Sequence, residues 1–313
     1  MRTVNKLAGV AGGTREGRVV RALAARFALL IMLSSASTAI AAPRHIRVLI
    51  IDGQNNHNWQ ETTPELKRIL EDTGLFDVDI LTAPPHGSDM SNFKPVFKNY
   101  RVVVSNYNGD TWPPDIKSAF EKYMRGGGGF VCYHAADNAF PEWHEYNRMI
   151  GLGGWGGRDE NAGPLWYYSG GRLISDDTPG RAGKHGLRKP FQLTNRDANN
   201  PITKGLPEVW MHTADELYSR LRGPGLNMTV LSTAFSDPAN SGSGHDEAML
   251  MTIRYGRGRI FHTTLGHDLE AMRCVGFRTT PQRGTEWAAT GKVKQAVPKN
   301  FPTADAESSR PIN

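Results

Sequence analysis

The stretch that most constrains the fold runs from Gly126 to His134. Four consecutive glycines are followed by the apolar run Phe130-Val131-Cys132-Tyr133 and then by a polar histidine. Clustered glycines indicate a tight turn, and a short apolar run bounded by turn signals is typical of a buried strand. In an open α/β sheet, ligands bind beyond the carboxyl ends of the parallel strands. The pattern therefore predicts that His134 lies at a ligand-binding edge.

Strand and helix patterns alternate around this central run. Apolar runs predict strands at residues 46–51, 76–81 and 100–105, and amphipathic patterns predict helices at 61–70 and 115–124. This rhythm predicts an α/β fold with a doubly wound, mostly parallel sheet and helices on both faces. Further strands are expected at 229–234, 249–255 and 258–264. Residues 140–200 form a looser segment rich in glycine and aromatic residues, which is typical of a functional loop or a lid.

The first 41 residues have the pattern of a secretory signal peptide. Six Lys or Arg residues accompany a single acid, the apolar run 27–33 follows, and Ala39-Ile40-Ala41 forms a cleavage site. The apolar run is too short to span a bilayer, so we favour cleavage over an uncleaved membrane anchor. We expect a periplasmic or secreted protein with one domain at residues 42–291 and a loose, polar C-terminal tail at residues 292–313.

The expected cleavage changes the charge of the protein. The whole chain has a formal net charge of +6, and residues 1–41 hold +5 of it, so the mature chain is left with +1. This near neutrality argues against a nucleic-acid or anionic-membrane partner. With the apolar run removed by cleavage, we expect no stable membrane insertion. No Lys-Ser or Lys-Thr follows a glycine cluster, so no P-loop or nucleotide cofactor is indicated. The two cysteines, Cys132 and Cys274, are expected to be buried free thiols rather than a pair.

Several motifs together resemble those of the ThuA-like (trehalose-utilisation) family. In chain order they are GGFVCYHAA at 128–136, PITKGLP at 201–207, DELY at 215–218, GRIFHTTLGH at 258–267 and GTEWA at 284–288. The resemblance spans roughly residues 46–291. It implies the class I glutamine amidotransferase-like fold, in which a flavodoxin-like sheet lies between helices. It also implies a link to the breakdown of trehalose and related glycosides, often beside dehydrogenases that make 3-keto sugars.

The resemblance also bears on the central histidine. In the amidotransferase relatives of this fold, a nucleophilic cysteine occupies the sharp turn after the central strand, and the resemblance places His134 at that turn. Cys132 lies two residues earlier, inside the predicted strand, where a reactive thiolate is not expected. Glutamine hydrolysis is therefore not inherited with the fold.

Histidines from separate segments are expected to meet at one edge of the sheet. His57, His134 and His267 each follow a strand that is predicted to be parallel, and Glu216 follows a predicted loop that can bring it near them. Two or three histidines with a carboxylate are a typical ligand set for a divalent metal such as zinc, with a position left open for substrate. We predict His134, His267 and Glu216 as catalytic residues, and His134, His267 and His57 as metal ligands.

The predicted substrate-binding residues are polar groups near strand ends and aromatic rings in the loose segment. Exposed Trp and Tyr rings suit the apolar faces of a sugar, although they can equally pin a long loop to the body of the protein. The set is His57, Asn106, Trp155, Trp166, Tyr167 and His212. The other histidines are expected to be structural or solvated: His262 as a hydrogen-bonded core residue, and His144, His185 and His245 in polar loops.

Two functions remain open at this point. The first is an enzyme that cleaves or isomerises a carbohydrate, of trehalose type or a 3-keto-glycoside, with a metal or a His/Glu acid–base pair. Hydrolysis by two carboxylates is disfavoured, because Asp215 and Glu216 are adjacent in sequence and neighbours seldom face the same ligand. The second is a non-catalytic periplasmic sugar-binding module, which needs no convergence of histidines. The sequence carries no signal for an oligomeric state.

Overall fold

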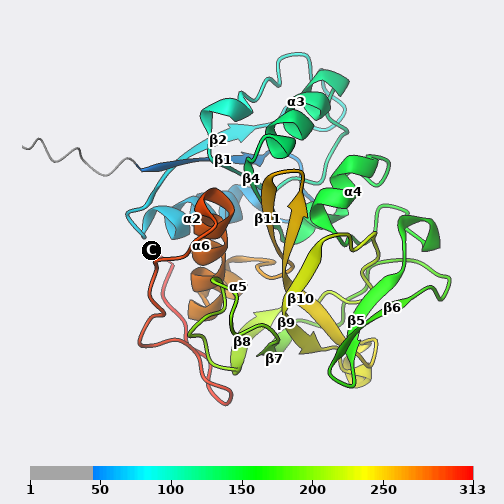
Figure 1. Cartoon of the computed structure of the whole chain (residues 1–313), viewed down its shortest axis with the longest axis vertical. Coiled ribbons are helices and arrows are strands. Elements are labelled where there is room, and N and C mark those ends of the chain that lie inside the picture. The colour runs from blue at the N-terminus through cyan, green and yellow to red at the C-terminus, as the bar shows by residue number, and fades with distance from the viewer. Residues whose placement is uncertain (1–44, 313) are drawn as a thin grey trace, which may run out of the picture. The chain divides into compact units, whose positions relative to one another are not determined.

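The computed structural model describes residues 45–312 (Figure 1). The predicted signal peptide at residues 1–41 lies outside the described residues. Within the described part of the chain, none of the helices combines the length and the apolar character needed to span a membrane.

Five neighbouring parallel strands form the half of the sheet that follows the predicted rhythm. Their spatial order is β2 (Phe76–Thr82), β1 (Ile46–Asp52), β3 (Val102–Ser105), β4 (Gly129–Tyr133) and β11 (Gly258–Thr263). Most of these strands are buried apolar runs, as expected of parallel strands covered on both faces. The order is flavodoxin-like, and it places the topological switch point between β1 and β3.

The rest of the sheet is antiparallel, so the sheet is mixed rather than mostly parallel. Beyond β11 follow β10 (Asp246–Tyr255), β9 (Met228–Phe235), β7 (Lys189–Asn195) and β8 (Val209–Asp215). The two residues Gly256-Arg257 connect β10 to β11, and a connection this short permits only an antiparallel pair. The predicted α/β class is confirmed, with the parallel strands at its core.

Helices cover both faces of the sheet (Figure 1). One hydrophobic cluster contains α3 (Pro114–Arg125) and α4 (His144–Ile150), and the other contains α2 (Trp59–Glu71), α5 (Leu269–Arg273) and α6 (Val275–Thr290). Strand β4 contributes to both, because alternate side chains point to opposite faces: Phe130 and Cys132 to the first cluster, Val131 and Tyr133 to the second. Short 3-10 helices are η1 (Phe97–Asn99), η2 (His134–Asn138), η3 (Glu160–Ala162) and η4 (Pro238–Asn240).

The glycine run that begins β4 is explained by turn geometry and close packing. Gly127 has φ +105°, a conformation that side chains rarely adopt. A Cβ atom on Gly129 would lie 2.8 Å from the Ala288 carbonyl oxygen of α6. The run therefore both ends α3 and lets the central strand approach the helix that covers it. Cys132 and Cys274 are buried and free, which confirms that prediction.

The segment from 140 to 200 is more regular than predicted. Strands β5 (Leu165–Ser169) and β6 (Arg172–Asp176) form a hairpin that pairs with β10. Its turn residues, Gly170 and Gly171, both have positive φ, which is the geometry of a two-residue type I′ turn. Aromatic residues favour strands, so the aromatic and Gly-Gly signals mark a hairpin here instead of an irregular lid.

Residues 292–312, expected to form a loose tail, are instead packed on the domain. The Met211 amide donates to the Thr303 carbonyl and the Val275 amide to the Ser308 carbonyl, each at 2.8 Å. Phe301 is buried, with its ring 5.4 Å from that of Trp210. Main-chain hydrogen bonds to distant segments hold this stretch, and the polar composition of the sequence gives no sign of them.

Candidate metal centre

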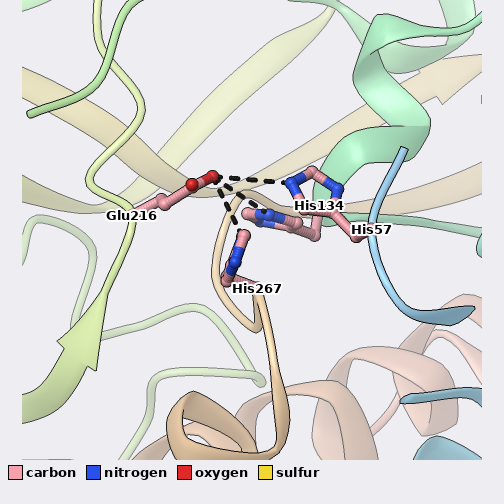
Figure 2. A group of neighbouring side chains, drawn as sticks. All are labelled: His57, His134, Glu216 and His267. Atoms are coloured by element: carbon pink, nitrogen blue, oxygen red, sulfur yellow. Dashed lines mark ion pairs between the residues drawn. The ribbon is translucent and has the colours of Figure 1, made fainter. Parts of the chain in front are cut away.

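Four side chains from the ends of four different strands meet at one point (Figure 2). His57 follows β1, His134 follows β4, Glu216 follows β8 and His267 follows β11. One nitrogen or oxygen atom from each residue lies within 4.8 Å of the others. The structure thus brings together the three histidines and the carboxylate that were predicted to share this edge.

His134 occupies the turn directly after the central strand. Its φ of 45° lies in the left-handed region, which a residue other than glycine seldom adopts. Its Nδ1 lies 2.6 Å from the Thr264 carbonyl oxygen, and since only an N–H can donate to a carbonyl, this nitrogen carries the proton. Burial lowers the pKa of His134 to about 4, so the ring is neutral near pH 7. Its Nε2 lone pair therefore faces the cluster.

The ring of His57 is oriented in a similar way. Its Nδ1 lies 3.2 Å from Oδ1 of Asn55, and the same oxygen accepts a hydrogen bond from the His57 amide at 2.9 Å. The amide oxygen is an acceptor, so Nδ1 is the protonated nitrogen. The remaining nitrogen, Nε2, lies 3.6 Å from Oε2 of Glu216. His57 thus also turns its Nε2 toward the centre.

Asn106, predicted to bind substrate, instead holds the loop that carries Asn55 and His57 through hydrogen bonds. It is buried, and its Nδ2 donates to the hydroxyl oxygens of Thr62 and Thr63 at 3.1 and 3.0 Å. Its Oδ1 accepts a hydrogen bond from Nδ2 of Asn55 at 2.8 Å. Asn106 therefore fixes the residue that orients His57 and does not itself line a cavity beside the cluster.

Glu216 faces all three imidazole rings (Figure 2). Its Oε2 lies 3.1 Å from Nδ1 of His267 and 3.7 Å from Nε2 of His134. Burial opposes the negative charge, but the neighbouring histidines hold the pKa of this carboxyl well below its usual range. Nδ1 of His267 is buried without a hydrogen bond among the described residues. Its nearest polar neighbour is Oε2 of Glu216, and a divalent cation held between the two atoms would supply a partner to both.

Asp215 joins the two loops that carry Glu216 and His267. Its Oδ1 accepts hydrogen bonds from the amides of Glu216 and His267 at 2.8 and 3.1 Å, and its Oδ2 accepts one from the Gly266 amide at 2.7 Å. Its side chain is buried and is not among the four whose ligand atoms converge. The two adjacent carboxylates therefore serve different purposes, as expected of sequence neighbours.

His212, predicted to bind substrate, does not reach a cavity. It is fully buried, and its Nε2 donates to Oδ2 of Asp215 at 2.8 Å. Burial opposes a charge on the ring, but Cys274 and Asp215 beside it raise the pKa of His212 to about 10. The corrected interpretation is that His212 stabilises the Asp215 carboxylate, because β8 turns this side chain inward.

We expect Asp215→Asn to weaken binding of a divalent ion by about 10- to 100-fold, the range found when an outer partner of metal ligands is lost. An amide cannot accept all the hydrogen bonds that the carboxylate accepts, so Glu216 and His267 lose their alignment. Competition with a chelating dye measures the dissociation constant of zinc. Glu270→Gln, an exposed carboxylate in α5, is the control and should leave it unchanged. Equal zinc affinities in the wild type, Asp215→Asn and Glu270→Gln would show that Asp215 does not orient the ligands.

Only one of the three predicted aromatic residues lies beside the cluster. Trp155 lines a cavity of about 300 Å³ together with His57 and Glu216. Trp166 donates from Nε1 to the Gly223 carbonyl at 2.9 Å, and Tyr167 stacks on His245 with ring centroids 3.9 Å apart. Neither lines this cavity. Both rings pin their hairpin to the body of the protein, which was the second interpretation of the aromatic segment.

Two residues near the cluster were not predicted. His185 is exposed, as expected, but it also lines the cavity, and its Nε2 lies 3.6 Å from Oε1 of Glu216. Tyr218 is buried, and its hydroxyl lies 3.0 Å from Nε2 of His134. Tyr218 stands two positions after Glu216, and in extended backbone this spacing indicates the same side. His185 had no such signal, because its position depends on a bridge between Lys184 and Ser219.

His262, as expected, is a core residue bonded to the Ile150 carbonyl.

Comparison with known proteins gives a consistent result over nearly the whole described chain. Residues 47–288 match the model of the ThuA family, described as trehalose utilisation. A ThuA-like protein from Parabacteroides merdae is 50% identical, with a TM-score of 0.84 over 85% of this chain and 98% of that one. A ThuA-like protein from Bacteroides uniformis, 18% identical with a TM-score of 0.52 over 83% and 97%, shares the fold. No curated protein matches the sequence.

Proposed function

The chain belongs to the ThuA (trehalose utilisation) family, and we propose that it cleaves or isomerises a neutral carbohydrate at a divalent metal centre. The proposed ligands are His57, His134, Glu216 and His267, and the proposed substrates are trehalose-type disaccharides or 3-keto-glycosides. The observation that carries the proposal is the convergence of four ligand atoms within 4.8 Å beside a cavity of about 300 Å³.

The residues fit a zinc-like ion. Imidazole nitrogen and carboxylate oxygen are preferred ligands of zinc, and ligating histidines usually donate their other N–H to a carbonyl or an amide oxygen. His134 and His57 have this arrangement, through Thr264 and Asn55. When bound, an ion of this kind polarises a carbonyl or hydroxyl oxygen and lowers the pKa of bound water. The carboxylate of Glu216 balances part of its charge.

The remaining side chains suggest how a sugar is held and how a proton is transferred. Trp155 offers an apolar face to a pyranose ring. Burial raises the pKa of Tyr218 well above its usual value, so its hydroxyl stays protonated and can donate a hydrogen bond. His185 is partly exposed at the cavity and is placed to accept a proton from a bound sugar. In a 3-keto-glycoside the proton next to the keto group is acidic, so such a base suits elimination or isomerisation.

A sugar-binding module without turnover is the second candidate, and the geometry favours it less. Such a module needs the cavity and Trp155, but a neutral sugar gives no reason for three imidazoles and a carboxylate to converge. We also propose a periplasmic or secreted location, on the pattern of residues 1–41 alone. Recovery of the uncleaved chain from the cytoplasm of its host would contradict this location.

Nuclear magnetic resonance of sugar mixtures tests the enzymatic proposal. Trehalose and a set of 3-keto-glycosides are incubated with the purified protein loaded with zinc, with and without a chelator. We expect the anomeric signals of at least one sugar to change, and we expect the chelator to stop the change because the ion polarises the reacting oxygen. Unchanged spectra for every sugar would favour the binding module.

A further inference from the structure

A second and larger cavity lies next to the small one. Its volume is about 760 Å³, and its lining includes Gly53 after β1, Thr82 at the end of β2 and Asn108 after β3. It therefore opens at the carboxyl ends of these strands and at the switch point between β1 and β3. This is where open α/β sheets bind ligands. Nothing in the proposed metal centre accounts for this cavity.

Two asparagines, Asn56 and Asn108, line both cavities. The Asn56 amide donates to Oδ1 of Asn108 at 3.2 Å, and Nδ2 of Asn108 donates back to Oδ1 of Asn56. The pair ties the loop after β1 to the loop after β3. A ligand that fills the small cavity reaches the large one by crossing this pair.

The loop after β1 contributes side chains to both the metal centre and the large cavity. It carries His57 at the metal centre, and two residues later Trp59, half-buried at the start of α2, lines the large cavity. The two cavities thus share a lining residue on this loop, Asn56. A molecule with two linked rings has the size to occupy both.

The lining indicates an uncharged ligand. Among the described residues, neither cavity is lined by Lys or Arg, so neither offers a phosphate the guanidinium or ammonium group that usually binds it. The two titratable side chains of the large cavity, His86 and Asp110, contact each other, with Nδ1 of His86 2.7 Å from Oδ1 of Asp110. The side chain of Gln60 is exposed and offers both a donor and an acceptor, which suits sugar hydroxyls. The Trp59 ring suits the apolar face of a pyranose.

We propose that the large cavity is a second sugar subsite, which binds the cyclic group attached to the sugar in the small cavity. The proposal rests on the proposed function for the identity of the first sugar. The ligand class is an uncharged glycoside with two linked rings, and the linkage lies over the Asn56–Asn108 pair, next to His57. A glycoside with only a methyl group in place of the second ring leaves the large cavity empty.

Calorimetric titration of the full chain compares trehalose with methyl α-glucoside, each also as its 3-keto derivative. We expect the two-ring sugar to bind about tenfold more tightly in the wild type, and we expect Trp59→Ala to remove this preference. Gln60→Ala, which changes an exposed side chain and leaves the core intact, should reduce the preference about threefold by the loss of a hydrogen bond. Tyr167→Ala, which removes an aromatic ring outside both cavities, should keep the full preference.

The outcomes separate this subsite from the enzymatic proposal. Equal binding of one-ring and two-ring sugars by the wild type, no binding of either, or a preference that survives both Trp59→Ala and Gln60→Ala overturns the subsite. A protein that converts a one-ring keto-glycoside but shows no two-ring preference keeps the enzymatic function and loses the subsite. A protein that prefers two rings through Trp59 but converts no sugar keeps the subsite and loses the enzymatic function.

Discussion

Purified His134→Ala protein is expected to contain only background amounts of divalent metal and to convert no sugar. His134 is one of the four proposed ligands, with its ring 4.8 Å from that of His57 and 5.6 Å from that of His267. Loss of an outer partner of a metal ligand costs about 10- to 100-fold in affinity, so loss of a ligand should cost at least about 100-fold. Elemental analysis and zinc titration measure this loss.

The fold of this variant should persist. Alanine inherits the left-handed backbone that His134 already adopts, and the main loss is the hydrogen bond to the Thr264 carbonyl, about 1–3 kcal/mol for a buried acceptor without a donor. His262→Gln is the matched control, because His262 is also fully buried and bonded to a carbonyl but lies outside the cluster. The control should keep its metal. Full zinc affinity in His134→Ala would place the metal centre elsewhere.

Arg158→Ala should cause the largest loss of stability, about 3–5 kcal/mol of unfolding free energy. Arg158 is only 4% exposed, and its guanidinium donates to the carbonyls of Asn138, Ala139 and Gly154 at 2.6–3.0 Å. It also donates to Oδ1 of Asn147. Each carbonyl left unpaired in the interior costs about 1–3 kcal/mol, of which water entry recovers part. Chemical denaturation measures the difference, and the melting temperature should fall by roughly 10 °C.

The same change should affect both the cavity and the metal centre. Arg158 donates to the Gly154 carbonyl beside Trp155 and also to the Asn138 and Ala139 carbonyls at the end of η2, the short helix that begins with His134. We therefore expect weaker sugar binding and weaker zinc binding at a temperature where the variant is folded. Arg148→Ala is the control, because this arginine is 40% exposed and its ion pair with Glu145 is worth at most about 1 kcal/mol. Equal stability of the two variants would refute the anchoring role of Arg158.

The parallel half of the fold was predictable because its signals are local. Strands β1, β3 and β4 are continuous apolar runs, and α3 has its apolar residues on one face, so hydrophobic periodicity identifies each of them. The β5–β6 hairpin and the packed segment 292–312 were not predicted. The hairpin pairs with β10, about 80 residues later in the chain, and the C-terminal segment is held by main-chain hydrogen bonds to β8 and to the start of α6.

In the candidate site too, local signals were predictable and contacts between distant segments were not. His57, His134 and His267 were predicted to meet because each follows a parallel strand, and parallel strands bring their carboxyl ends to one edge. His212 was placed wrongly, because it stands within β8, where alternation turns its side chain into the interior. His185 was overlooked, because it approaches Glu216 only through a bridge between two distant loops.

The sequence by itself determined the strands of the parallel half, the helices α2 and α3, and the polar residues that follow those strands, because periodicity and turn chemistry act over a few residues. Only the tertiary structure decided which side chains face each other, which imidazole nitrogens point into the cluster, and which two cavities share the Asn56–Asn108 pair. Those properties depend on the order of strands in the sheet and on hydrogen bonds between loops far apart in the chain. The strand order and these hydrogen bonds are in turn set by the packing and main-chain pairing of the whole domain.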